Sequence, residues 1–508
     1  MSEEKPDIKE IEQMANELIF KEFYPVNPPF GFVGIQVDDD NGKKTYYAIE
    51  PSLNEEEDQI LTAIKNSIIT NVGVSIDVLK NDDLMKQYLD QMIKKVLKKY
   101  KKRVPMESED KFKYYLNRDF LGYGKIDLLF HDENIEDISC NGVNTPIYIW
   151  HRVHESLPTN IIFPTEDELN FAVTRLVYKT GHQISIANPI LEGTLPEGYR
   201  AHITLDEISK RGDTFTIRKF RTNPFTIVDL IQLGTLDPKI AAYSWLLIEY
   251  LRSIMVCGAV ASGKTALLNS ISMFIKPEMK VVTIEEVREL RLHENWIPMT
   301  TRPSYQPGIQ EVTLFDLLRS ALRQRPDYII VGEVRGEEAY TLFQSIAVGH
   351  GGLCSIHADN EDSVIKRLLT RPMDIPAMML PLMNCLIQIR RVTVNGQVAR
   401  RVDSVSEITE IDHATGEPVL ETRFKWDAAT DTFKYIKPKN GAKSVFNLIS
   451  EIHQVPLSKL NEELERRETI LKWMVNVGVK NYDDVANIIR NYYHAPEDVY
   501  RVARLGFN

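Results

Sequence analysis

One eight-residue segment constrains the fold of this 508-residue chain more than any other. It matches the pattern GxxxxGK[ST], and its residues are Gly258, Ala259, Val260, Ala261, Ser262, Gly263, Lys264 and Thr265. An apolar strand pattern at residues 254–257 precedes it, and a helical pattern at residues 265–274 follows. A glycine-rich turn between a buried strand and a helix directs main-chain N–H groups at phosphate oxygens. The sequence therefore predicts a nucleotide-phosphate loop inside an α/β domain.

The last two residues of this loop have separate expected roles. Lys264 is expected to reach the β- and γ-phosphates of ATP. The hydroxyl of Thr265 is expected to be a ligand of Mg²⁺. The predicted cofactors are therefore ATP and Mg²⁺.

Acidic residues follow two further strand patterns. The apolar run at residues 328–331 leads to Glu333, whose carboxylate is expected beside the Mg²⁺ shell. A second acidic segment contains Glu285, Glu286 and Glu289, any of which could orient or deprotonate the attacking water. The spacing alone does not rank these three residues, and we take Glu286 as the first choice.

Histidines and arginines supply further candidates. His350 and His357 stand at either end of one predicted strand, where an imidazole could sense the γ-phosphate or couple it to a neighbouring subunit. No third ligand at suitable spacing accompanies them, which argues against a metal site. Several arginines are candidates for stabilising transition-state charge from a second domain or a neighbouring subunit: Arg200, Arg218, Arg221, Arg302, Arg323, Arg325 and Arg335.

Composition and turn signals divide the chain into four parts. Residues 1–105 are predicted as a variable, mainly helical region, and residues 106–225 as a small α+β domain. Residues 226–238, with Gly234 and Pro238, are predicted as a linker. Residues 239–508 alternate apolar strands with helices, which is typical of a parallel sheet covered by helices and here followed by C-terminal helices. The strand candidates are residues 254–256, 281–284, 328–331 and 353–356.

Two local signals follow these strands. Asn395 and Gly396 are typical of a hairpin turn. Leu460, Leu464 and Leu471 have the spacing of a helix that packs into the core.

Charge, cysteine usage and hydropathy bear on the partners. The net charge of −11 argues against nucleic acid as the main partner, because nucleic-acid binders usually present a basic surface. The four cysteines form no CxxC pair, so neither a zinc site nor a disulfide framework is expected. Residues 375–389 are too short and too interrupted to span a bilayer, and residues 1–12 lack the apolar core of a signal peptide. Any membrane association is therefore expected to go through a partner or a surface patch.

Taken in order, these motifs resemble those of the type II/IV secretion ATPase superfamily. The resemblance covers roughly residues 110–410. It rests on the phosphate loop, the acidic segment at 284–290, the run at 322–333 and the two histidines. In the second part of the chain, residues 122–124, 135–138, 195–200 and 216–220 are similar to that family's N-terminal domain. Archaeal members are the most similar: GspE-like secretion or pilus ATPases and archaellum motor ATPases.

The resemblance implies a fold and a set of residue roles. The fold is α/β, with a RecA-like P-loop NTPase core, an α+β, PAS-like N-terminal domain and an extra helical N-terminal region. By carry-over, Lys264 and Thr265 hold phosphate and Mg²⁺, Glu286 activates water and Glu333 supports Mg²⁺. The remaining family roles are γ-phosphate sensing by His350 and His357, and contact with nucleotide or a subunit boundary by Arg200 and Arg218.

Two departures from the family pattern accompany the resemblance. The chain lacks the four-cysteine zinc subdomain usual in bacterial GspE-type enzymes, and the second acid of the acidic segment is Glu286 where the family usually has Asp. The carboxylate at this position therefore reaches farther from the backbone.

The resemblance further implies a homo-hexameric ATPase at the cytoplasmic face of the cell membrane. Its partner would be a polytopic platform protein, and its hydrolysis of ATP would drive protein secretion or type IV pilus-like filament assembly. Pilin-like or secreted substrates would be moved indirectly, and no nucleic acid is expected. The alternatives are an archaellum motor, a RecA-like nucleic-acid translocase, or a scaffold that binds ATP without hydrolysing it.

Overall fold

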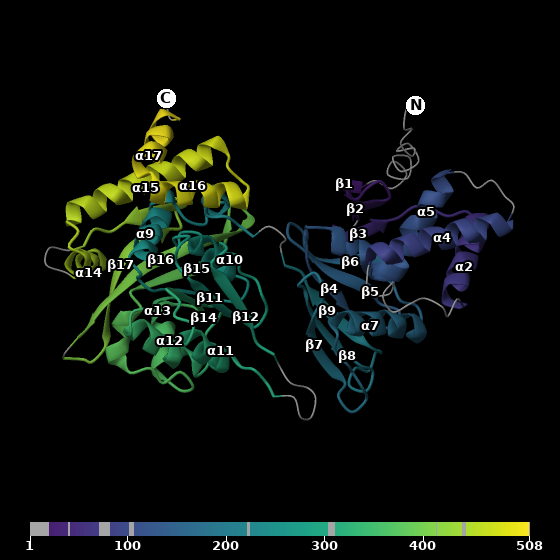
Figure 1. Cartoon of the computed structure of the whole chain (residues 1–508), viewed down its shortest axis with the longest axis horizontal. Coiled ribbons are helices and arrows are strands. Elements are labelled where there is room, and N and C mark those ends of the chain that lie inside the picture. The colour runs from purple at the N-terminus through teal and green to yellow at the C-terminus, as the bar shows by residue number, and fades with distance from the viewer. Residues whose placement is uncertain are drawn as a thin grey trace. The chain divides into compact units, whose positions relative to one another are not determined.

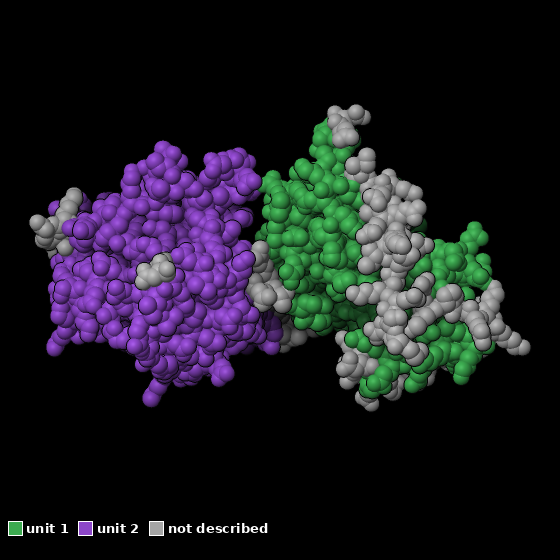
Figure 2. Space-filling model, turned by 90° about the horizontal axis from the view of Figure 1, so that it is seen from above, with its two compact units in different colours: residues 1–221 green, residues 222–508 purple. Residues whose placement is uncertain are grey.

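The computed structural model describes residues 20–38, 41–70, 82–100, 106–220, 224–302, 310–412, 414–438 and 443–506. The chain divides into two compact units, residues 1–221 and residues 222–508, coloured separately in Figure 2. Each unit has its own hydrophobic core and is described by itself.

Within the described residues, the first unit is built on a sheet of nine strands, in the order β1-β2-β3-β6-β5-β4-β9-β8-β7 (Figure 1). The strands are β1 (Phe20–Asn27), β2 (Gly31–Val37), β3 (Lys44–Ile49), β4 (Ile135–Cys140), β5 (Pro146–His151), β6 (Glu155–Ile162), β7 (Ile190–Thr194), β8 (Arg200–Thr204) and β9 (Thr214–Arg218). Neighbouring strands pair antiparallel except β3 and β6, which are parallel.

The helices of the first unit enter two cores. They are α2 (Glu55–Thr70), α4 (Asp82–Tyr100), α5 (Met106–Leu116), α6 (Asp127–His131) and α7 (Glu166–Thr180), with short turns η1 (Asn117–Leu121) and η2 (Gly124–Ile126). Helix α7 buries Leu169, Val173 and Leu176 against the sheet. The side chain of Thr165 caps its first turn, and Gly181 ends it at a φ of 71°. Helices α2, α4 and α5 pack on one another around a separate apolar cluster.

The sheet extends across the boundary expected at residue 105. The described part of residues 1–105 contains β1 to β3 as well as α2 and α4, whereas the sequence suggested a mainly helical region. Tyr46 of β3 pairs with Thr159 of β6, and Val33, Ile35 and Tyr46 are fully buried in the core that α7 covers. These strands belong to the same sheet because their apolar side chains complete its core. Residues 1–19 lie outside the described residues.

The second unit is also built on nine described strands, in the order β12-β11-β13-β14-β10-β15-β16-β17-β18. They are β10 (Ile254–Gly258), β11 (Val281–Glu285), β12 (Trp296–Thr300), β13 (Tyr328–Val331), β14 (Gly351–His357), β15 (Cys385–Val394), β16 (Gln397–Ile411), β17 (Pro418–Asp427) and β18 (Thr432–Tyr435). The strands from β12 to β15 are parallel, and β15 to β18 form an antiparallel meander. The four buried strands predicted around residues 254, 281, 328 and 353 are therefore confirmed.

Helices cover both faces of the parallel strands. They are α8 (Ile227–Gln232), α9 (Pro238–Glu249), α10 (Lys264–Ser272), α11 (Leu314–Leu322), α12 (Glu338–Ala347), α13 (Glu361–Leu369), η3 (Ala377–Leu382), α14 (Val445–His453), α15 (Leu457–Val477), α16 (Tyr482–His494) and α17 (Pro496–Leu505). Val256 of β10 packs with α9 and α10, while its neighbour Cys257 packs with α11, α12 and α13. Figure 1 shows these two helix groups on opposite sides of the sheet. Successive side chains of a strand point to opposite faces, which explains why these strands are apolar throughout.

Residues 226–238, predicted as a linker, are folded into the second unit. Thr226 caps α8 by exchanging hydrogen bonds with Asp229, and Ile227 and Val228 are fully buried. The carbonyl of Thr235 accepts a hydrogen bond of 2.7 Å from the N–H of Val402. The apolar residues at 227–230 have helical spacing and enter the core, so Gly234 marks a turn between two helices. The boundary between the units falls instead at residues 221 and 222.

The C-terminal segments agree with two further predictions. Asn395 and Gly396, both with positive φ, form the predicted turn between β15 and β16. Leu460, Leu464 and Leu471 of α15 lie in the core against α9, as their helical spacing predicted. The four cysteines are all buried. Within the described ranges, the chain forms no helix with the length and hydrophobicity needed to cross a bilayer.

Candidate active site

The phosphate loop connects β10 to α10 at the carboxyl edge of the parallel strands. A side chain on Gly258 would lie 2.4 Å from the carbonyl oxygen of Ile389 and 2.5 Å from Oγ of Ser262, so this position has room for glycine alone. Gly263, which caps α10, has a φ of 97°, a left-handed conformation that favours glycine. Ala261 is also left-handed, at a φ of 60°. The conformation of the loop and the start of α10 are therefore those of a phosphate-binding loop, in which main-chain N–H groups face the phosphate.

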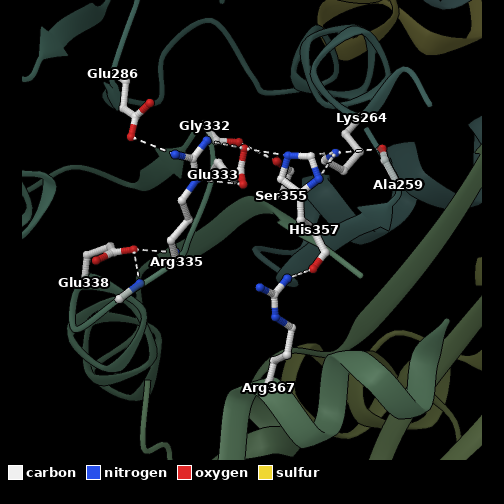
Figure 3. A network of polar contacts seen from close by, with 11 residues as sticks. Ala259, Lys264, Glu286, Gly332, Glu333, Arg335, Glu338, Ser355, His357 and Arg367 are labelled. Atoms are coloured by element: carbon white, nitrogen blue, oxygen red, sulfur yellow. Dashed lines mark hydrogen bonds and ion pairs between the residues drawn. The ribbon is translucent and has the colours of Figure 1, made fainter. Parts of the chain in front are cut away.

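Lys264 is buried at the start of α10 and faces the loop and β14 (Figure 3). Its Nζ donates to the carbonyl of Ala259 at 3.1 Å and lies 3.1 Å from Nδ1 of His357. Burial lowers the pKa of Lys264, against the opposing effect of the nearby Glu333 carboxylate. The predicted phosphate ligand and the second predicted histidine are therefore in direct contact.

His357 also contacts the predicted acid of the third strand pattern. Its Nε2 lies 3.2 Å from Oε2 of Glu333. Burial, followed by the charge of Lys264, lowers the pKa of His357, which favours a neutral ring. A neutral ring protonated on Nε2 satisfies both contacts, because Nδ1 then accepts from Lys264 and Nε2 donates to Glu333.

Arg335 links the two acidic segments. Its Nε donates to Oε1 of Glu333 at 2.9 Å, and its Nη2 donates to Oε2 at 3.1 Å. Its Nη1 donates to Oε1 of Glu286 at 3.2 Å. Burial opposes ionisation of Glu333, but the hydrogen bonds and charge of Arg335 outweigh it and lower the pKa of Glu333. A continuous polar chain thus runs from Lys264 to Glu286, as Figure 3 shows.

The neighbouring residue Glu285 has a different environment. It is 3% exposed, and its Oε1 accepts from the N–H groups of Glu289 and Leu290 at 2.9 and 3.1 Å. Within the described chain, its Oε2 is buried without a hydrogen-bond partner. A side chain on Gly332 would lie 3.2 Å from Cγ of Glu285, so this carboxyl group packs against the end of β13. Burial raises the pKa of Glu285 to about 7.

His350 is far from this cluster in the folded structure. It precedes β14, whose opposite end carries His357, and its Nδ1 contacts the carbonyl oxygen of Pro326 at 2.7 Å. The register of β10 and β14 pairs Gly258 with His357, so the loop and His350 are at opposite edges of the sheet. The structure therefore brings one of the two predicted histidines to the phosphate loop.

Arg200 and Arg218 lie in the first unit, directly opposite each other on β8 and β9. Arg200 pairs with Glu192 at 3.0 Å, and Arg218 pairs with Asp137 at 3.1 Å. The side chain of Arg218 is 59% exposed. The two predicted arginines thus lie side by side on that sheet, each paired with a carboxylate.

Three contributors to the site had no assigned role in the sequence prediction. Arg335 was one of several unranked arginines, and its place two residues after Glu333 was the available signal. The hydroxyl of Ser355 donates to the carbonyl of Gly332 at 2.6 Å and supports the turn that carries Glu333. Arg367 of α13 donates to the carbonyl of His357. These last two act through main-chain atoms, which sequence motifs do not reveal.

A pocket of about 550 Å³ opens beside the loop. It is lined by Ala259, Val260, His357, Ala358, Asp359, Ser363 and Arg367. The hydroxyl of Thr265, in the first turn of α10, and the carboxylate of Glu333 supply oxygen donors of the kind that Mg²⁺ prefers. The residues present therefore fit a magnesium-bound nucleotide phosphate.

Comparisons with known proteins identify the family of this chain. The family model described as "Type II/IV secretion system protein" matches residues 132–414, more than half of the chain. The Methanocaldococcus jannaschii protein MJ0900, described as uncharacterized, is 35% identical over 449 residues, which cover 88% of this chain and 79% of MJ0900.

Two further similarities come from bacterial type IV secretion systems. The Bordetella pertussis protein PtlH is 32% identical over 273 residues, covering 48% of this chain and 80% of PtlH. The solved structure of the Brucella suis VirB11 ATPase is 23% identical, covers 57% of this chain and 96% of that one, and has a TM-score of 0.29. On the family match and the MJ0900 alignment together, this chain belongs to the type II/IV secretion system protein family.

Proposed function

We propose that this protein hydrolyses Mg-ATP and converts the reaction into movement of a secretion or filament-assembly machine. The family supports a secretion or pilus-type ATPase. The observation that carries the proposal is the contact chain from Lys264 through His357 to Glu333 at the mouth of the phosphate loop. These are the charges needed around a phosphate tail whose terminal group is cleaved.

The proposed binding roles follow from position. The main-chain N–H groups of the loop and the ammonium of Lys264 bind the phosphates, and Thr265 and Glu333 hold the metal shell. Mg²⁺, when bound, neutralises charge that develops on the phosphate oxygens. His357 reports the terminal phosphate because it shares the ammonium of Lys264, which phosphate oxygens attract away from the imidazole.

Two carboxylates compete for the role of water-activating base. Glu286, the first choice from the sequence, is paired with the guanidinium of Arg335, and such pairing weakens a base. Glu285 is shielded from solvent, has one carboxylate oxygen without a partner among the described residues, and has a pKa raised to about 7. A base is most effective when its pKa is near the working pH, so we favour Glu285.

The remaining predicted residues have roles that require an assembly. We propose a homo-hexamer in which Arg200 and Arg218 supply positive charge to a nucleotide, from the same or a neighbouring subunit. In this assembly His350, at the other edge of the sheet, would couple one subunit to its neighbour. The pairing of Arg200 and Arg218 on adjacent strands supports a joint role for them.

We further propose that the ring acts at the cytoplasmic face of the membrane on a polytopic platform protein. Its hydrolysis would power secretion or type IV pilus-like assembly, with an archaellum motor as the alternative machine. The first unit would include the PAS-like domain of the family.

The test is ATP turnover by the purified chain, with its mass in solution measured with and without Mg-ATP. We expect turnover that requires Mg²⁺ and a mass of six subunits. Stimulation of turnover by DNA or RNA would favour the nucleic-acid translocase, and binding without turnover in the intact hexamer would favour the scaffold. Co-purification with archaellum components in place of a pilin-type platform protein would favour the archaellum motor.

A further inference from the structure

Arg335 lies between the two acidic segments of the site and contacts both. All three of its guanidinium nitrogens donate to carboxylates, two of them to Glu333 and the third to Glu286. The fork to Glu333 is bidentate, a geometry that lysine does not reproduce. Hydrogen bonds to Glu333 are the first cause of a raised pKa for Arg335, so the group carries its charge throughout the physiological range.

The backbone of Arg335 is also held in place. Its N–H donates to Oε1 of Glu338 at 2.5 Å, and the N–H of Gly336 donates to the same oxygen at 2.7 Å. Glu338 is buried at the start of α12. A Cβ at Gly336 would lie 3.0 Å from Oε2 of Glu338, so the carboxylate packs closely against this turn. The turn is therefore built so that the guanidinium falls between the two acids.

This arrangement occupies the acid that is proposed to support the metal. Both carboxylate oxygens of Glu333 accept from Arg335, and one of them also contacts His357. A cation that uses Glu333 shares this carboxylate with the guanidinium and competes with it for the negative charge. Glu286 attracts the same guanidinium from the other side.

We propose that Arg335 is a positioning residue that competes with Mg²⁺ for Glu333, and that Glu286 favours metal loading by drawing the guanidinium toward itself. The inference rests on the proposed function, because it concerns the metal bound with nucleotide. It predicts opposite effects for the two partners of one ion pair. Removal of Arg335 frees Glu333 for the metal, whereas removal of the Glu286 charge leaves Arg335 to Glu333 alone.

The experiment measures binding, so it does not depend on turnover. The dissociation constant of a fluorescent non-hydrolysable ATP analogue, mant-AMPPNP, is determined for the full chain in excess Mg²⁺ and in EDTA. The ratio of the two constants is the gain in affinity that Mg²⁺ confers, a coupling between metal and nucleotide. The variants are Arg335→Gln, Glu286→Gln and the double variant.

We expect Arg335→Gln to increase this magnesium gain by about threefold, the scale of a partly exposed ion pair, and Glu286→Gln to decrease it by about as much. The double variant should match Arg335→Gln alone, because Glu286 acts through Arg335. Arg335→Lys should give an intermediate gain, since it keeps the charge and loses the fork. Arg319→Gln removes an exposed guanidinium on α11 of the same unit and should leave the gain unchanged.

Two results would overturn the inference while the proposed function stands. One is a wild-type gain that neither substitution alters. The other is a gain that falls in Arg335→Gln, which would mean that Arg335 aids the metal. A wild-type chain that binds the analogue in neither condition would instead remove the proposed function, and this inference with it. Circular dichroism of each variant separates these results from loss of fold.

Discussion

The ammonium of Lys264 lies 3.1 Å from Nδ1 of His357, although 93 residues separate them in the chain. The contact follows from strand register, because Gly258 at the end of β10 pairs with His357 at the end of β14. Parallel strands bring their carboxyl ends to one edge of a sheet, and Glu333 reaches the same edge from β13. The site is therefore a property of three adjacent strands.

Lys264→Ala should abolish tight nucleotide binding. The ammonium is the one cation that the loop itself contributes to the phosphates, and loss of such a charge-assisted contact costs on the order of tenfold or more in affinity. Titration with a fluorescent ATP analogue measures this. Lys366→Ala, an exposed lysine on α13, is the matched control and should bind normally. Equal affinity of the two variants would contradict the assignment of the loop.

Glu285→Gln should reduce ATP turnover far more than Glu286→Gln. A missing general base costs on the order of a hundredfold or more, whereas the loss of Glu286 weakens one exposed ion pair. Single-turnover hydrolysis at saturating ATP measures both variants, and both should still bind nucleotide. Normal hydrolysis by Glu285→Gln, with a slow Glu286→Gln, would return the base to Glu286.

The titration of Glu285 should appear in the pH dependence of stability. Its pKa is about 7 in the folded chain, against 4.5 for a glutamate exposed to water, so folding favours its protonated form. The stability that this protonated carboxyl group contributes is fully present below pH 4.5 and is lost as the pH rises through 7. Over that interval wild type should lose up to about 3 kcal/mol relative to Glu285→Gln, at about 1.36 kcal/mol per pKa unit. Urea unfolding of both proteins at several pH values measures the difference, and parallel curves would refute it.

Arg401→Ala should destabilise the second unit. The buried guanidinium binds Asp431 through two hydrogen bonds of 2.7 and 2.9 Å and donates to the carbonyl of Leu233 at 3.0 Å. It thereby holds the end of α8 to the antiparallel strands. Loss of these bonds should lower the free energy of unfolding by about 1–3 kcal/mol. The midpoint of urea unfolding measures this, and Arg319→Ala, an exposed arginine, is the control. An unchanged midpoint would show that residues 226–238 are held by their apolar contacts alone.

Local patterns predicted most of the second unit correctly. The loop at 258–265, the apolar runs of the parallel strands and the Asn395–Gly396 turn each depend on neighbouring residues, so sequence was sufficient. Patterns were less informative at 226–238, where Gly234 and Pro238 suggested a linker. Those residues punctuate two helices, and burial of Ile227 and Val228 is visible only once the core is assembled.

The sequence by itself determined the residue types of the candidate site: a glycine-rich loop, its lysine, and acids after apolar strands. These depend on residue type and spacing along a few turns of chain. Tertiary structure alone decided which of these groups meet. It placed His357 against Lys264 and His350 at the far edge of the sheet, and it gave Glu286 a cation while it buried Glu285. Contacts between strands distant in sequence depend on register and burial, which no local pattern encodes.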